Sequence, residues 1–172
     1  MKAIVVYESH WGNTAAVARE IAAGIGPEAR ALSTAEATPP VAAEADLIVA
    51  GAPLMAFRLP TEQMVEGIVA KPGEPAVELD QPTMRAWLAS LPWGRGACAA
   101  FETKLRWSPG GATGAIERGL GSAGYRRISP AHKFQVEGRS GPLHEGELER
   151  ARAWGSELAA LVHERAAVPV RA

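Results

Sequence analysis

Hydrophobic residues along this chain occur in short continuous runs and in runs with helical spacing. Ala3–Tyr7 and Asp46–Gly51 are nearly continuous apolar runs, which are typical of strands buried on both faces of a parallel sheet. Between them, apolar residues recur every four positions from Val17 to Ile25. This spacing predicts a helix that begins near residues 13–14 and ends at Gly26-Pro27.

The rest of the chain continues this alternation. Further strands are predicted at residues 29–32, 97–101, 125–128 and 133–136. Further helices are predicted at residues 61–69, 84–91, 113–120 and 148–162. The alternation predicts a single α/β domain over residues 1–172, with helices packed on a parallel sheet. Ligands of such sheets bind beyond the carboxyl ends of the strands, which singles out the loops after Tyr7, Gly51 and Phe101.

Composition narrows the class of protein. Eighteen basic and nineteen acidic side chains give a net charge of −1, so no global field favours nucleic acid. Cys98 is the only cysteine, and the four histidines lack metal-ligand spacing. The longest apolar run, Leu47–Phe57, is too short to span a membrane, and Glu8 and His10 interrupt any signal-peptide core. We expect a cytoplasmic protein with no metal site, no nucleic-acid partner and no membrane span.

Charge is distributed unevenly along the sequence. Residues 36–80 contain eight acidic and two basic side chains, whereas residues 103–133 contain six basic side chains and one acidic one. Two solvated faces would account for this difference. The alternative interpretation is that one side of the protein tunes a ligand or docks a partner.

The segment Glu-Ser-His-Trp-Gly-Asn-Thr, residues 8–14, joins the first predicted strand to the first predicted helix. A phosphate at this position would meet the free N–H groups and the positive dipole end of the helix start. Ser9, Asn13 and Thr14 add side-chain donors, and Gly12 allows close backbone approach. The segment therefore predicts a phosphate-binding loop.

Such a loop would hold phosphate mainly with neutral donors, because residues 8–14 contain no Lys or Arg. A protonated His10 would add charge. The same residues would also serve as a plain turn and helix cap, which is the alternative. The segment lacks the lysine of a P-loop and the three spaced glycines of a dinucleotide fold. A receiver domain is disfavoured as well, because Ala50-Gly51-Ala52 stands where its phosphate-accepting Asp would be.

The segment from Val5 to Thr14 resembles the first strand and FMN-phosphate loop of the flavodoxin family, whose pattern is Ser/Thr-x-x-Gly-x-Thr. Asp46–Gly51 resembles the third strand of that family, and the resemblance extends from Met1 to about Val162. It implies a flavodoxin-like α/β fold, a doubly wound three-layer sandwich. The implied parallel sheet has five strands in the order 2-1-3-4-5, with FMN bound at the strand ends.

The resemblance also implies that three loops contact FMN. The matching residues are Ser9, His10, Trp11, Gly12, Asn13 and Thr14 in the phosphate loop, Pro53, Leu54, Met55, Ala56 and Phe57 beside the flavin ring, and Glu102, Thr103 and Trp107 in the third loop. His10 and Trp11 stand where the family often has hydroxyl residues, so their backbone amides would remain as donors. Met55, Phe57 and Trp107 are the candidates to flank the ring, or they are packing residues of the loops.

The two loops beside the ring carry Arg58, Lys104 and Arg106, whereas typical flavodoxins resemble one another in being strongly acidic. A unit charge about 8 Å away at an effective dielectric near 40 contributes about 1 kcal/mol. We expect these cations to stabilise the anionic reduced flavin. The alternative is that the three side chains point to water.

Three functions follow from the resemblance. The first is an FMN-binding electron carrier that exchanges electrons with redox partner proteins and uses no catalytic side chain. The second is an FMN-dependent reductase or dehydrogenase acting on a small redox substrate, a quinone or a porphyrinogen. The third is a flavodoxin-like module that has lost FMN and acts through protein contacts.

Overall fold

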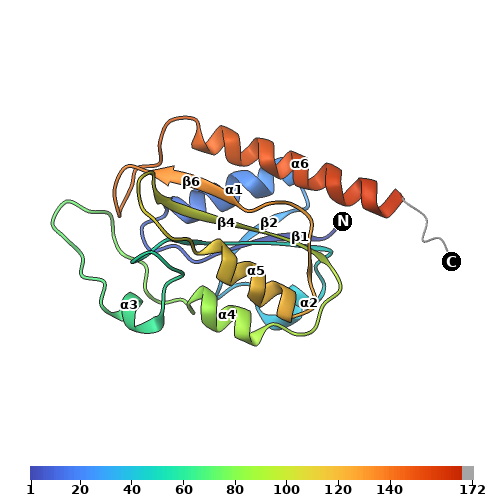
Figure 1. The fold of residues 1–172 in the computed structure, drawn as a ribbon, viewed down its shortest axis with the longest axis horizontal. Helices are drawn as coiled ribbons and strands as arrows, with labels where there is room; N and C mark the ends of the chain where they lie inside the picture. Colours follow the sequence, from blue (N-terminus) through green and yellow to red (C-terminus); the bar gives the residue numbers. More distant parts are fainter. Residues whose placement is uncertain (168–172) are drawn as a thin grey trace.

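The computed structural model describes residues 1–167 and contains one parallel sheet (Figure 1). Its strands are β1 (Ala3–Tyr7), β2 (Arg30–Ser33), β3 (Leu47–Pro53), β4 (Ala97–Leu105), β5 (Arg126–Arg127) and β6 (His132–Val136). The order across the sheet is β2-β1-β3-β4-β5, with β6 also paired to β4. The predicted flavodoxin-like order 2-1-3-4-5 is confirmed.

The fifth position of the sheet is shared by two short strands. β5 pairs with the start of β4, where Ala97 faces Arg126, and β6 pairs with its second half, where Phe101 faces His132. Pro130 lies between β5 and β6 and has no N–H to donate to a sheet. The interruption therefore follows from the sequence, although the five-stranded prediction did not include it.

Helices cover both faces of the sheet (Figure 1). They are α1 (Asn13–Ile25), α2 (Pro39–Ala43), α3 (Glu62–Glu66), α4 (Met84–Ser90), α5 (Thr113–Ser122) and α6 (Glu147–Ala167). Val5 packs with α1 and α6, whereas its neighbour Val6 packs with α4 and α5. Alternate residues of each buried strand thus build two cores, one on either side of the sheet.

Three elements differ from the sequence prediction. α2 was not predicted, yet Pro39 and Pro40 occupy its first turn, where proline is tolerated. The helix predicted over residues 61–69 is confined to Glu62–Glu66. β4 continues four residues beyond the predicted end at Phe101, because residues 101–105 pair with β6.

No helix within residues 1–167 combines the length and the apolar character that crossing a bilayer would require.

Candidate functional site

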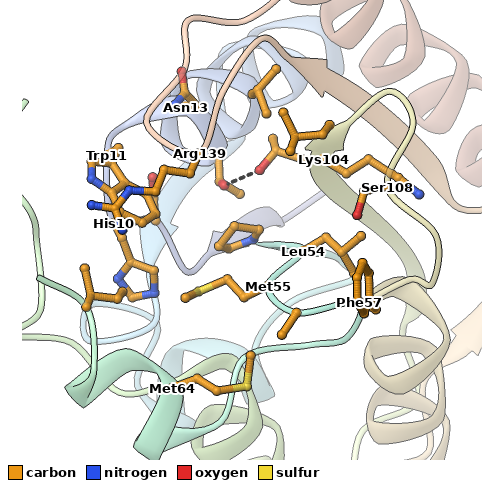
Figure 2. A pocket seen from close by; sticks show the side chains of 18 of the residues that line it. His10, Trp11, Asn13, Leu54, Met55, Phe57, Met64, Lys104, Ser108 and Arg139 are labelled. Carbon is orange, nitrogen blue, oxygen red and sulfur yellow. Dashed lines mark hydrogen bonds between the residues drawn. The ribbon is translucent and has the colours of Figure 1, made fainter. Parts of the chain in front are cut away.

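A cavity of about 430 Å³ opens beyond the carboxyl ends of β1, β3 and β4 (Figure 2). Small-molecule sites commonly fall in the range of about 300–1,000 Å³. The lining residues come from five places in the chain and are Ser9, His10, Trp11, Asn13, Thr14, Pro53, Leu54, Met55, Ala56, Phe57, Met64, Gly67, Ile68, Thr103, Lys104, Leu105, Trp107, Ser108, Val136 and Arg139. The cavity lies where parallel α/β sheets bind their ligands.

The loop between β1 and α1 presents unpaired backbone N–H groups. Gly12 has φ +88°, a left-handed conformation that glycine adopts without strain, and α1 begins at the next residue. The Ser9 hydroxyl accepts from the Ala15 amide at 3.2 Å, and the Gly12 carbonyl accepts from the Ala16 amide at 2.9 Å. Within residues 1–167, the amides of residues 10–14 donate no hydrogen bond. The loop therefore leaves these amides without an acceptor inside the described chain.

Two contacts hold the start of α1 against its neighbours. The hydroxyl groups of Thr14 and Thr103 lie 2.8 Å apart and are hydrogen-bonded, which ties α1 to β4. Gly141 packs on Asn13 so closely that a Cβ at this glycine would lie 2.6 Å from the Asn13 Oδ1 atom. The loop after β6 therefore packs against the loop after β1.

The side chain of His10, a residue of the loop between β1 and α1, is buried, with a relative exposure of 2%. Its Nδ1 lies 2.9 Å from the Glu78 carbonyl oxygen, and its Nε2 lies 2.9 Å from the Glu8 carboxylate. Burial alone would lower the pKa of His10, but the hydrogen bonds to Glu8 and Glu78 outweigh burial and raise the pKa. The ring thus favours the imidazolium form, which donates to both oxygens.

The segment before α4 forms hydrogen bonds with the loop between β1 and α1. The Glu78 amide donates to the His10 carbonyl at 2.9 Å, and the Gln81 side-chain amide donates to the Ser9 carbonyl at 2.6 Å. The second oxygen of the Glu8 carboxylate accepts from the Met84 amide at 2.6 Å. These bonds occupy the carbonyl groups of residues 9 and 10, so the loop is fixed while its N–H groups stay free.

The turn after β3 forms one wall of the cavity. The Met55 and Arg58 amides each donate to the other residue's carbonyl at 3.0 Å, which closes a two-residue turn. Ala56 and Phe57 occupy that turn with φ +41° and +69°, a conformation that is uncommon outside glycine. The Phe57 carbonyl also accepts from the Gly111 amide at 3.3 Å. The turn is therefore fastened to the loop after β4.

Glu102 lies apart from the predicted ring contacts. It is fully buried in β4, and its carboxylate accepts from the Ala112 and Thr113 amides at 2.5 and 3.1 Å. It therefore caps the start of α5 and does not line the cavity, whereas Thr103 and Trp107 do. Successive residues of a strand point to opposite faces, and sequence resemblance alone did not give this register.

Gly12 is the other predicted residue outside the lining, and it borders a neighbouring cavity on the far side of the loop. The structure brings the remaining twelve predicted residues together around one cavity.

Sequence reasoning missed two contributions to the cavity. Met64, Gly67 and Ile68 come from α3 and the chain after it, where the sequence indicated only a short helix. Arg139 follows β6, and its guanidinium lies over the Trp11 ring at 5.3 Å from the ring centroid (Figure 2). The position of residue 139 just beyond a predicted strand end was the one available signal for this arginine.

Basic side chains line the cavity, and each has a carboxylate partner outside the lining. Lys104, Arg139 and the buried His10 line it, and no Asp or Glu does among the lining residues. Lys104 lies 3.9 Å from the Glu102 carboxylate. Arg139 binds the Glu74 carboxylate at 2.7 Å, and its hydrogen bonds lower the pKa of Glu74 to about 2. The carboxylates of Glu8, Glu102 and Glu74 therefore offset these three charges.

Comparison with known proteins gives matches to solved flavodoxin structures. A flavodoxin from the domain Archaea is 25% identical, with 95% of this chain and 99% of that one covered and a TM-score of 0.66. Oxidised flavodoxin 1 from Bacillus cereus is 18% identical over 95% and 98% of the two chains, with a TM-score of 0.62. A WrbA-like flavodoxin from Agrobacterium tumefaciens is 18% identical over 94% and 97%, with a TM-score of 0.63. No family model and no curated protein sequence matches the chain.

Proposed function

Because the chain is a flavodoxin-like protein by fold, we propose that it binds FMN in this cavity and carries electrons between redox partners in the cytoplasm. The observation that carries the proposal is the loop of residues 10–14, whose amides are free at the start of α1. A phosphate monoester there would receive several N–H donors and the positive end of the helix dipole. Bound FMN would supply the capacity to accept and donate one or two electrons.

The lining groups fit the two halves of FMN. Ser9, Asn13 and Thr14 lie at the phosphate loop, so polar donors gather at one end. Leu54 and Met55 line the wall on the β3 side, where apolar surface suits a flavin ring. In this arrangement the side chains bind and orient the cofactor and exclude water from part of it, and none forms a covalent bond.

The double variant Ser9→Ala with Thr14→Ala tests this phosphate site. Loss of two hydrogen bonds to a charged phosphate, at about 1.5 kcal/mol each, weakens FMN binding by roughly 100-fold. Riboflavin, which lacks the phosphate, binds the variant and the parent protein alike. Fluorescence titration with both ligands measures the two affinities.

The matched control is Thr38→Ala with Ser122→Ala, two hydroxyl groups on exposed residues away from the cavity. The control variant keeps the affinity of the parent protein for FMN. Unchanged FMN affinity in the Ser9/Thr14 variant, with its fold intact by circular dichroism, would place the phosphate elsewhere.

A second candidate function is an FMN-dependent reductase or dehydrogenase acting on a quinone or a porphyrinogen. The observation that favours it is that Lys104 and Arg139 line the cavity, each with a carboxylate partner outside the lining, and their remaining N–H donors suit the carboxylates of a porphyrinogen beside the cofactor. Steady oxidation of NAD(P)H by a quinone, catalysed by the purified protein alone, would support this function. Its absence, with rapid electron exchange with redox proteins, supports the carrier.

A further inference from the structure

Two large aromatic side chains stand exposed at the opening of the cavity. Phe57 and Trp107 are 57% and 76% exposed, and both line the cavity edge. Water-exposed aromatic surface at a functional opening is typical of contact sites. Their loops are joined by the hydrogen bond from the Gly111 amide to the Phe57 carbonyl. The two rings are therefore presented by a connected pair of loops.

An arginine adjoins each aromatic residue in sequence. Arg58 follows Phe57 and Arg106 precedes Trp107, and both arginines are exposed. In the part of the chain that the structure describes, neither forms an ion pair within 4.0 Å. We name the four residues Phe57, Arg58, Arg106 and Trp107 the mouth cluster. Its two charges are available to a partner.

The backbone at Phe57 adopts a conformation that is uncommon for a bulky residue. Two-residue turns of this kind favour Asn-Gly, because both positions require positive φ. This chain instead has Ala56 and Phe57 there, at φ +41° and +69°. Strained positions of this type concentrate at functional sites. Phe57 is 57% exposed there, so more than half of its surface is open to a partner.

We propose that the mouth cluster is a docking surface for an acidic redox protein. The inference rests on the proposed function, since it assigns the class of partner that exchanges electrons with the bound flavin. Two unpaired arginines beside aromatic rings match an acidic patch, which steers association and supplies contacts for aromatic and arginine residues. The two guanidinium groups are exposed on neighbouring loops, which suits a broad protein surface better than a small nucleotide.

Native and succinylated cytochrome c provide a matched pair of probes, because succinylation converts a basic surface into an acidic one on the same haem protein. The FMN-loaded protein is reduced with dithionite, freed of excess reductant and mixed with either ferric cytochrome in a stopped-flow instrument. Each haem takes one electron, so one fully reduced flavin reduces two cytochrome molecules and returns to the oxidised state with release of its protons. The rate constants are compared at 10 mM and 500 mM salt.

We expect succinylated cytochrome c to react at least 10-fold faster than the native form at low salt, with the preference lost at high salt. The double variant Arg58→Gln with Arg106→Gln loses this preference. The control Arg95→Gln with Arg126→Gln removes two charges at the opposite end of the sheet and retains it. For each variant, the rate constant with succinylated cytochrome c is divided by the rate constant with native cytochrome c. A change in flavin potential affects both rate constants together and leaves this ratio unchanged.

Each remaining outcome contradicts a specific claim. A protein that takes up no FMN refutes the proposed function and the docking inference with it. The docking inference alone is refuted if the protein takes up FMN but reacts faster with native cytochrome c. It is also refuted if the Arg58/Arg106 and Arg95/Arg126 variants show the same ratio of rate constants for the two cytochromes. Rapid flavin reduction by NADPH that only the Arg58/Arg106 variant lacks would assign the arginines to a nucleotide and also refute the docking inference.

Discussion

At the scale of single residues, His10 links the loop between β1 and α1 to the interior. Its ring bridges the Glu8 carboxylate and the Glu78 carbonyl, and its own carbonyl accepts from the Glu78 amide. A neutral imidazole has one N–H and could satisfy only one of the two ring acceptors as a donor. Protonation of the ring therefore favours the conformation that leaves the neighbouring amides free.

This bridge predicts a pH-dependent contribution to stability. The pKa of His10 is raised above 6.5 in the folded protein, so its contribution is fully present below the unfolded value of about 6.5 and is lost as pH rises through the folded value. We expect His10→Gln to lower the free energy of unfolding by about 1–3 kcal/mol at pH 6, and by less at alkaline pH. Urea denaturation of the protein without cofactor, from pH 6 to 9, measures the difference.

The control is His163→Gln, at an exposed position of α6, and it leaves stability nearly unchanged across this range. A His10→Gln difference that stays constant with pH would contradict the bridging imidazolium.

The loop between β1 and α1 could be recognised from sequence as a candidate phosphate site, because a strand, a glycine and hydroxyl residues before a helix have a local chemical meaning. Arg139 could not, since its approach to Trp11 depends on the packing of two loops that are 128 residues apart, from position 11 to position 139. Burial of the His10 ring could not be predicted either, because it depends on a contact between segments far apart in sequence. Its partner Glu78 belongs to a segment with no regular structure.

At the scale of secondary structure, Glu102 joins β4 to α5. Its buried carboxylate accepts from the amides of Ala112 and Thr113 at the start of the helix. A carboxylate there also favours the positive end of the helix dipole. The sequence prediction placed Glu102 in a cofactor loop, whereas the structure shows it acting as a cap within a longer strand.

Removal of this cap should destabilise the fold and spare the cavity. Glu102→Ala leaves two buried N–H groups without an acceptor, and we expect the free energy of unfolding to fall by about 2–4 kcal/mol. The folded variant keeps its FMN affinity within about 3-fold. Denaturant unfolding and FMN titration together measure both properties.

Glu28→Ala, at a side chain that is 82% exposed, serves as the control and has little effect on either property. If Glu102→Ala kept full stability but lost much of its FMN affinity, Glu102 would be a cofactor contact and not a helix cap.

The elements themselves were largely predictable. Continuous apolar runs gave β1 and β3, and four-residue spacing gave α1, because each pattern reflects burial on a defined face. The end of β4 was missed because its polar residues Glu102 and Thr103 resemble a loop in sequence. Both are nevertheless buried, through partners 10 or more residues away in sequence, at Ala112 and Thr14.

At the scale of the whole molecule, the charge near the cavity bears on the flavin potential. Arg58 and Arg106 are exposed and unpaired in the described chain, whereas Lys104 faces the buried Glu102 carboxylate. Each free cation about 8 Å from the ring would stabilise an anionic reduced flavin by about 1 kcal/mol at an effective dielectric near 40. This amounts to roughly 20 mV for a two-electron couple.

We therefore expect Arg58→Gln with Arg106→Gln to lower the two-electron reduction potential of bound FMN by about 40 mV. Redox titration against dyes of known potential measures the shift. The Arg95→Gln/Arg126→Gln control, at the other end of the sheet, changes it by less than about 10 mV at moderate salt. An unchanged potential in the first variant would show that these side chains do not act on the ring.

The central claim is that free amides between β1 and α1 bind the phosphate of FMN. The most direct measurement is the visible absorption spectrum of the purified protein, recorded before and after addition of FMN and removal of unbound ligand. The account predicts a retained flavin spectrum with one FMN per chain and quenched flavin fluorescence. A protein that stays colourless with FMN in excess, and whose tryptophan fluorescence does not change, would contradict it.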